Sequence, residues 1–499
     1  MESAWNLLAG LGLFMSAALF LLLKQRKSRV DTRNHPPGPP AWPIFGNIFD
    51  LGAIPHQTFY KLKEKYGPVI WLKLGYTNTL VIQSAEAAAE LFKNHDLAFS
   101  DRKVPLVLTA HNYNQGSMAI GRYGPNWSML RRLCSSKLMR TKQLDRTAVL
   151  RQKCIDDMIK YIEEDIAHYL FIMTFNLIGN LVLSRDLVSP RSIDGQEFYD
   201  AMNKFMKWAG TPNVADFFPF LKWLDPQGIM RNMVQDMGQA MRIVEKFVKE
   251  RTEERKSGRK KTNDFLDALL EYEGDGKDEP DVISDQNIRT IILEMFLAGS
   301  ETASATIEWA MTELLRDPVA MGRATEELHQ VVGPQRKVEE SDIDQLPYLQ
   351  AVIKETLRLH PVAPLLLPRN TLEDTNFMGY LIPKDTQVFV NAWAIGRDPD
   401  SWEDPMSFKP ERFLGSNIEY RGQNFELIPF GAGRRICVGI SLAHRVLHLG
   451  LASLLHCFEW ELGSNSTPET IDMNERVGLA ASKLKPLEAK PKKGRENNK

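Results

Sequence analysis

A glycine-rich loop around one cysteine limits what this chain can fold into more than any other feature. Residues 429–439 read Pro-Phe-Gly-Ala-Gly-Arg-Arg-Ile-Cys-Val-Gly, and they lead into the apolar segment 440–455. The three glycines let the backbone bend tightly, approach a flat ligand and turn main-chain N–H groups toward the sulfur. These donors, with positive charge from Arg435, favour the thiolate form of Cys437. The pattern predicts that Cys437 ligates haem iron and that Phe430, Arg435 and Gly439 contact the cofactor, whereas a lone cysteine is otherwise a small apolar side chain on a turn.

Composition indicates a large globular protein and excludes some partners. The chain has 499 residues, and 43% of them are hydrophobic, which is enough for an extensive core. The 62 lysine and arginine residues balance 63 aspartate and glutamate residues, so no basic field favours nucleic acid as a partner. The four cysteines are too scattered for a disulfide framework or a paired zinc site, and they fit a reducing cytosolic environment.

The N-terminal segment predicts a membrane anchor. Residues 7–23 are almost wholly apolar, near the lower limit of length for a helix that crosses a bilayer. Basic residues between positions 24 and 33 follow at once and should stay on the cytosolic side. A cleaved signal peptide is the alternative, but its positive charge would precede the apolar run. We therefore expect an anchor over residues 1–23, a basic and proline-rich linker over 24–45 that acts as a semi-rigid spacer, and one domain over 46–499.

Strand signals are few, so the domain is predicted to be mainly α with a minor β-sheet. A hairpin is expected from residues 69–74 and 79–83 around the turn Gly75-Tyr76-Thr77-Asn78. A second β segment covers residues 379–391, and a third lies near 477–482. No internal repeat and no shift in composition divides the globular part, which indicates one large domain.

The remaining segments read mostly as helices. Ser84 is expected to cap a helix over 85–94, and another helix covers 346–359. The charged stretch 249–261 reads as a solvated loop. Residues 284–315 form a long helix that is interrupted by Ala298-Gly299-Ser300-Glu301-Thr302. A glycine inside a helix costs about 1 kcal/mol relative to alanine, so Gly299 is expected to make room for a ligand.

Two side chains in this interruption are candidates for catalysis. Thr302 offers a hydroxyl that can relay a proton or hold an oxygen species, and Glu301 offers a carboxylate that can feed the relay. The structural alternative is a kinked helix in which Thr302 donates its hydroxyl to a carbonyl of its own preceding turn. Because a haem loop lies elsewhere in the chain, the sequence favours the catalytic role.

Several arginines are candidates for holding the cofactor. Haem carries two propionates, and guanidinium groups bind carboxylates through two parallel hydrogen bonds. Arg131 lies four residues after Trp127 and shares a helix face with it, so both are assigned to the cofactor. Arg369, at the end of a proline-flanked leucine run, and Arg435 are assigned to the same group.

A second set of charges is expected to support the site without taking part in the chemistry. Glu355 and Arg358 lie three residues apart on the predicted helix over 346–359, so their side chains can pair on one face. Most such pairs lie on the surface and contribute little. With Arg412, these two residues would instead form a buried ion-pair network behind the cysteine loop.

Together these motifs resemble the cytochrome P-450 superfamily of haem-thiolate monooxygenases, from the proline spacer to about Pro486. The elements are Trp127-x-x-x-Arg131, Ala298-Gly299-x-Glu301-Thr302, Glu355-x-x-Arg358, Pro410-Glu411-Arg412-Phe413 and the cysteine loop. Finer features, such as Ala215-Asp216-Phe217-Phe218-Pro219, are similar to plant microsomal enzymes of the geraniol hydroxylase and iridoid oxidase group. The resemblance implies the cytochrome P-450 fold, with a single large haem domain and haem b as cofactor.

The resemblance also implies a function. The chain would be a monooxygenase that uses O2 and NADPH, with electrons delivered singly by NADPH-cytochrome P-450 reductase. It would be a single-pass protein of the endoplasmic reticulum membrane with its catalytic domain in the cytosol. The Cys437 thiolate would favour O–O cleavage, and Thr302 and Glu301 would supply protons. A small apolar substrate, a monoterpenoid or iridoid, would bind in a pocket lined by Ala298, Leu365, Leu366, Leu367, Leu479 and Ala480.

Three departures from the family pattern and three alternatives remain at this point. Val438 replaces a proline that often follows the cysteine, and the connection over 163–166 is shorter than usual. Ala303 stands where a second hydroxyl is usual, so the relay depends more on Thr302 and Ser304. The alternatives are a phenylpropanoid or alkaloid hydroxylase, a haem-binding protein without oxygen chemistry, and a membrane-tethered binding module.

Overall fold

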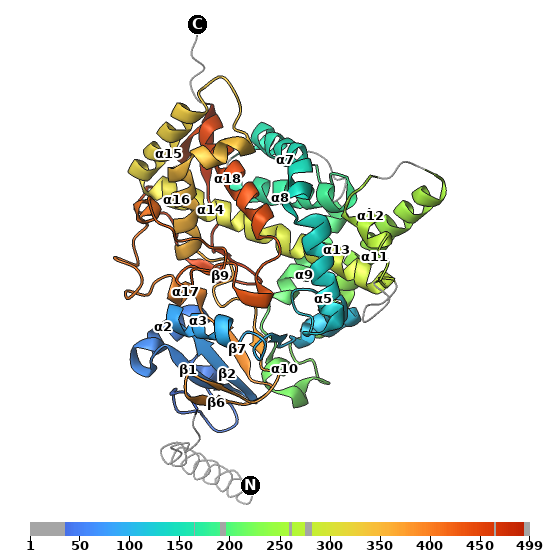
Figure 1. The fold of residues 1–499 in the computed structure, drawn as a ribbon, viewed down its shortest axis with the longest axis vertical. Coiled ribbons are helices and arrows are strands. Elements are labelled where there is room, and N and C mark those ends of the chain that lie inside the picture. Colours follow the sequence, from blue (N-terminus) through green and yellow to red (C-terminus); the bar gives the residue numbers. More distant parts are fainter. Residues whose placement is uncertain are drawn as a thin grey trace, which may run out of the picture.

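Helices make up most of the structure, and the main sheet lies at one end of it (Figure 1). The computed structural model describes residues 35–163, 165–189, 196–258, 262–274, 282–463 and 466–493. This is the mainly α fold with a minor sheet that the sequence predicts. The anchor expected over residues 1–23 lies outside the described residues and stays a prediction.

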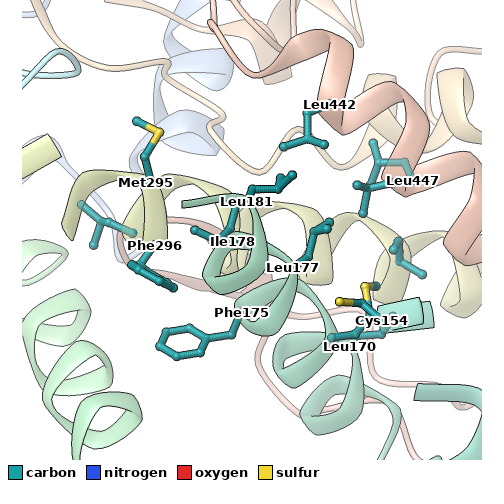
Figure 2. Close-up of a cluster of buried hydrophobic side chains, with 14 of the residues drawn as sticks. Cys154, Leu170, Phe175, Leu177, Ile178, Leu181, Met295, Phe296, Leu442 and Leu447 are labelled. Atoms are coloured by element: carbon teal, nitrogen blue, oxygen red, sulfur yellow. The ribbon is translucent and has the colours of Figure 1, made fainter. Parts of the chain in front are cut away.

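The core is built around helix α8 (Ile166–Leu183). This helix packs against α7 (Ala148–Tyr161), α13 (Asp285–Gly299) and α14 (Glu301–Arg316). Figure 2 shows side chains of α7, α8, α13 and α18 (Ile440–Cys457) in one apolar cluster. Within the described part of the chain, α8 alone is long and apolar enough to cross a membrane, but 72% of it is buried. Its apolar character therefore follows from its central place in the core.

The other α-helices surround this core. They are α2 (Pro55–Tyr66), α3 (Ala85–Asn94), α4 (Tyr113–Gly116), α5 (Pro125–Leu133), α6 (Thr141–Arg146), α9 (Gln196–Ala209), α10 (Val214–Phe217), α11 (Ile229–Lys256), α12 (Phe265–Leu270), α15 (Pro318–Val331), α16 (Pro347–Leu359) and α17 (Ala392–Ile395). Ser84 caps α3 by accepting a hydrogen bond from the N–H of Ala87, as the sequence predicts. The predicted break in the long helix lies at Ser300, between α13 and α14.

The charged stretch over 249–261 was predicted to be a loop, and this is wrong for its first part. Helix α11 continues to Lys256. The charges stabilise the helix because Lys249 pairs with Glu245 one turn earlier, with an Nζ to Oε1 distance of 2.8 Å. Arg251 is buried and donates to Asp264 and Asp267 at 2.8 and 3.0 Å, so this arginine is part of the packing between α11 and α12.

The main sheet has the strand order β1-β2-β7-β4-β3. Strands β1 (Val69–Leu74) and β2 (Thr77–Ile82) form the expected hairpin, but its turn is only Gly75-Tyr76. Strand β7 (Gln387–Val390) runs parallel to β2, and β4 (Arg369–Asn370) joins it to β3 (Asp101–Arg102). Because Arg102 pairs with Arg369 in the register, this edge of the sheet brings two arginines together.

Three two-stranded antiparallel sheets complete the described β structure. The predicted segment 379–391 is divided between β7 and β6 (Tyr380–Ile382), which pairs with β5 (Thr375–Phe377). The expected strand near residue 480 is a hairpin of β9 (Glu475–Val477) and β10 (Ala481–Lys483). Strand β8 (Phe458–Leu462) follows α18 and pairs with β11 (Ala489–Lys493).

Candidate active site

The cysteine loop holds its shape through glycines and one buried carboxylate. Gly431 and Gly433 have φ angles of 72° and 68°, in the left-handed region that favours glycine. A Cβ on Gly433 would lie 2.4 Å from Oδ1 of Asp96, so a side chain at this position would collide with that carboxylate. Asp96 accepts a hydrogen bond from the N–H of Arg434 at 2.9 Å. The loop is therefore fastened to the residues just after α3.

The sulfur of Cys437 has the donors that a thiolate needs. Burial raises the pKa of the Cys437 thiol, while the N–H groups of Gly439 and Ile440 and the charge of Arg131 oppose the rise. The sequence predicts that Arg435 supplies this charge, but in the structure it comes from Arg131. Although protein surrounds the sulfur, the Cys437 side chain keeps accessible surface, so a ligand can reach it.

The donor set fits haem better than a bare metal ion. In the described ranges, no group of three or more His, Cys, Asp and Glu side chains could hold a metal ion by itself. A single thiolate would suit haem iron, because the porphyrin itself supplies most of the ligands that the iron needs. All four cysteines are free, as expected from their spacing.

Three buried arginines lie close together near this loop. They are Arg102, Arg369 and Arg435. Burial lowers the pKa of each one; Arg369 lowers the pKa of both others further, and that of Arg435 falls to about 10. Mutual repulsion among buried cations is relieved by anions, and haem brings two carboxylates. The cluster therefore fits the propionate side of the cofactor.

Hydrogen bonds to backbone carbonyl groups orient each guanidinium in this cluster. Arg435 donates to the carbonyls of Ser100 and Gly121, both at 2.8 Å. Arg369 donates to Asp96 at 3.1 Å and to the carbonyl of Ala432 at 3.0 Å. Arg102 donates to the carbonyls of Ala119 and Leu367 at 2.9 and 2.6 Å. Sequence reasoning missed Arg102, because the signal that identifies it is its pairing with Arg369 across β3 and β4.

Helix α5 presents Trp127 and Arg131 to the same region. The indole N–H of Trp127 donates to the carbonyl of Met118 at 2.9 Å. Its ring lies 4.1 Å from the guanidinium carbon of Arg435, which is a cation–π contact. The guanidinium of Arg131 makes no hydrogen bond to any residue in the described ranges. Trp127 thus supports Arg435, while Arg131 keeps its donors available.

The break between α13 and α14 places Thr302 and Glu301. Thr302 donates its hydroxyl to the carbonyl of Ala298 at 2.6 Å, which is the backbone contact that the sequence left as an alternative. The lone pairs of this hydroxyl remain able to accept a proton donor. Burial raises the pKa of the Glu301 carboxyl, opposed by Arg476 on β9, and its Oε2 has no hydrogen-bond partner among the described residues.

Gly299 does not have the role that the sequence suggested. A Cβ at this position would lie 2.5 Å from Cδ1 of Ile178, so the glycine allows α13 to approach α8 closely. Its neighbour Ala298 is exposed although the helix before it is buried. Room for a ligand is therefore expected beside the exposed Ala298.

Apart from Ala298, the predicted pocket residues lie on two segments that contact each other. Leu367 is 36% exposed, and Leu365 and Leu366 are half-buried. The N–H of Ala481 donates to the carbonyl of Val362 at 2.8 Å, which fixes the turn between β9 and β10 beside the leucines. The same turn touches the end of α9, because a Cβ on Gly210 would lie 2.3 Å from the nitrogen of Leu479. Leu479 is half-buried, but Ala480 is only 3% exposed and offers little surface to a substrate.

Glu355, Arg358 and Arg412 form one buried network. Arg358 donates from Nε and Nη2 to the two oxygens of Glu355, both at 2.7 Å, and both side chains have no exposed surface. Arg412 donates to Glu355 Oε1 at 3.0 Å. The two arginines also donate to carbonyls of Gly396, Glu403, Pro405 and Ser407. The network fixes the segment that leads from α17 toward the cysteine loop, and it has no direct bond to the loop.

A free, accessible cysteine with backbone donors to its sulfur, an arginine cluster and a broken helix together define a haem-thiolate oxygenase. Residues 36–487 match the cytochrome P450 family. The chain therefore belongs to this family, and it is a haem-dependent monooxygenase.

Similar proteins include plant enzymes and solved animal structures. The chain is 57% identical to iridoid oxidase of Catharanthus roseus over 491 residues, which is 95% of both chains. It is 42% identical to geraniol 8-hydroxylase of the same plant, covering 92% of this chain and 94% of that one. Among solved structures, a zebra fish cytochrome P450 with progesterone aligns with a TM-score of 0.76 at 27% identity, covering 88% of this chain and 99% of that one.

Proposed function

We propose that this monooxygenase oxidises a small terpenoid, an iridoid or a monoterpenoid alcohol, at a methyl group. The observation that carries the proposal is the 57% identity to iridoid oxidase over nearly the whole length of both chains. Geraniol 8-hydroxylases of two plants and a drimenol monooxygenase are also similar, at 41–42% identity. The leucines at 365–367 and Leu479 would give the pocket an apolar wall, which suits such substrates.

A phenylpropanoid is the second candidate substrate. A 7-ethoxycoumarin O-deethylase of Helianthus tuberosus is 43% identical over 463 residues. Product analysis by mass spectrometry distinguishes the two, with purified protein, reductase and NADPH supplied with iridoid alcohols, geraniol or 7-ethoxycoumarin. The terpenoid proposal expects oxygenated products from the first two at higher kcat/KM than from the coumarin. Turnover of the coumarin alone would favour the second candidate.

Each part of the reaction would depend on particular residues of this chain. Haem, when bound, supplies the iron at which dioxygen is activated, and electron donation by a thiolate favours O–O cleavage. Cys437 would be that thiolate ligand. Arg102, Arg131, Arg369 and Arg435 would hold the two propionates. Thr302 would accept and pass on protons that arrive through Glu301, whose carboxyl is protonated more readily because burial raises its pKa.

Changing Thr302 to alanine is expected to lower product formation on the order of a hundredfold, the lower end of the range for a lost proton-transfer group. NADPH consumption should continue, because the change touches neither the ligand nor the arginine cluster. The yield of product per NADPH measures the effect. The matched control is Thr302→Ser, which keeps the hydroxyl and should retain most of the yield. A wild-type yield in Thr302→Ala would remove Thr302 from the mechanism.

Electrons would arrive at the outer face of the segment that runs from α5 to α6. This surface carries five exposed basic side chains, Arg132, Lys137, Arg140, Lys142 and Arg146. Arg131 also lies on α5, and its charge lowers the pKa of the Cys437 thiol. This surface therefore lies close to the proposed iron ligand, Cys437. A basic face of this kind would bind an acidic face of the membrane-bound reductase, with an affinity that falls as salt rises.

The catalytic domain would also contact the bilayer directly, beside the expected anchor in the endoplasmic reticulum membrane. Exposed apolar side chains gather where α10 meets the β1–β2 turn: Ile44, Phe45, Phe49, Tyr76, Phe220, Trp223 and Leu224. Rings of Phe45, Tyr76 and Phe220 each lie about 6 Å from Phe218, which joins them into one patch. Soluble surfaces rarely expose such a patch, and aromatic rings favour the membrane interface.

Trp223, 81% exposed, provides the test of this membrane contact. The full chain in vesicles with brominated acyl chains should show quenched tryptophan emission. Trp223→Phe is expected to reduce the quenched fraction, whereas Trp402→Phe, a change at a buried tryptophan, should leave it unaltered. Equal quenching in both variants would mean that the patch does not enter the bilayer.

A further inference from the structure

The loop over residues 117–121 is held from one side by Glu294 of α13. Only 1% of Glu294 is exposed, and its carboxylate accepts three hydrogen bonds from the loop. The N–H groups of Met118 and Ala119 donate at 2.7 and 3.0 Å, and the Ser117 hydroxyl also donates. The same hydroxyl accepts the N–H of Ile120 at 3.0 Å, which closes the turn.

From its other side, the same loop orients the groups assigned to the cofactor. The carbonyl of Met118 accepts hydrogen bonds from Trp127 at 2.9 Å and from Arg435 at 3.3 Å. The carbonyl of Ala119 accepts one from Arg102 at 2.9 Å. Gly121 offers its carbonyl to Arg435 at 2.8 Å. Two of the three clustered guanidiniums and the indole therefore take their direction from one short loop.

Both oxygens of Glu294 act as hydrogen-bond acceptors. Oε1 accepts from Ser117 and Ala119, and Oε2 accepts from Met118. Burial raises the pKa of Glu294, while these three donors and the charge of Arg435 oppose the rise. A carboxylate satisfies several N–H donors at once, but an amide would place its own N–H2 against one of them. The negative charge also offsets the repulsion within the arginine cluster.

We infer that Glu294 is a positioning residue for the cofactor: it fixes the loop over 117–121, and the carbonyls of that loop aim Arg102 and Arg435 at the propionates. The inference rests on the proposed place of these arginines at the haem carboxylates. Groups that orient the direct partners of a bound metal centre commonly change its affinity about 10- to 100-fold when they are altered. Glu294 would act in this way through the loop.

The test compares Glu294→Gln with Glu308→Gln in purified, haem-loaded protein. Glu308 is a matched control because it is also a buried carboxyl on the neighbouring helix α14, and it accepts the N–H of Leu487, away from the loop. The measurement is the rate at which haem transfers to an excess of a haem-free globin. We expect about tenfold faster loss or more from Glu294→Gln. Glu308→Gln should lose haem at the wild-type rate, even if its unfolding temperature falls equally.

Two further variants keep the inference testable if Glu294→Gln does not accumulate. Ser117→Ala removes one donor and should speed haem loss less than Glu294→Gln, and Glu294→Asp should restore part of the retention. Equal rates of haem loss in Glu294→Gln and Glu308→Gln would overturn the inference. If Arg102→Ala and Arg435→Ala also retained haem at the wild-type rate, the proposed place of the arginines would fail instead.

Discussion

Replacing Glu355 with glutamine is expected to destabilise the folded domain by about 3–5 kcal/mol, the usual cost of removing one partner from a buried ion pair. Glu355 has no exposed surface, and its two oxygens hold Arg358 and Arg412. The glutamine amide is uncharged, so Arg358 and Arg412 would be left with hydrogen bonds to uncharged carbonyl groups. Arg358 has no exposed surface, so water cannot replace the lost partner. Since these arginines fix the backbone between Gly396 and Ser407, the damage should extend to the segment that leads toward the cysteine loop.

Denaturant unfolding measures this effect, and a surface pair supplies the control. Glu411 pairs with Arg323, and both side chains are nearly half exposed. Such pairs contribute about 0–1 kcal/mol, so Glu411→Gln should shift the midpoint only slightly. Similar midpoints for Glu355→Gln and Glu411→Gln would contradict the structural role assigned to the buried network.

Replacing Cys437 with serine is expected to abolish product formation that depends on NADPH. A serine hydroxyl is far less acidic than a thiol, so it stays protonated and cannot replace a thiolate ligand. Without a thiolate, the electron donation that favours O–O cleavage is lost. Product yield with reductase and the best terpenoid substrate measures the effect.

Cys457→Ser is the matched control for this change. Cys457 is also a free cysteine, at the other end of α18, and it is half-buried. The control variant should form product at the wild-type rate. Activity retained in Cys437→Ser would show that another residue holds the iron.

The sequence predicted those parts of the site whose members lie within one motif. Glu355 and Arg358 are one helical turn apart, so their pairing follows from helix geometry. The backbone donors to Cys437 come from the two residues Gly439 and Ile440 that follow it closely in the chain. Helix α3 and its Ser84 cap were predictable for the same reason.

Contacts between distant segments could not be predicted in this way. Arg102 and Glu294 carry no local signal, because each is defined by partners that the fold brings from elsewhere in the chain. The prediction that Gly299 makes room for a ligand was wrong. A glycine inside a helix indicates that another group approaches closely, but only the fold shows that this group is Ile178. The extension of α11 to Lys256 depends on Arg251, whose acidic partners lie beyond the helix on α12 and its cap.

The absorption spectrum of the reduced protein with carbon monoxide tests the central claim most directly. A ferrous carbonyl haem with a thiolate ligand has a characteristic long-wavelength band, which neutral ligands do not give. The unaltered protein should show this band, and Cys437→Ser should lose it while Cys457→Ser keeps it. A haem-loaded protein without the band, or a band that survives in Cys437→Ser, would contradict the assignment of Cys437 as the iron ligand.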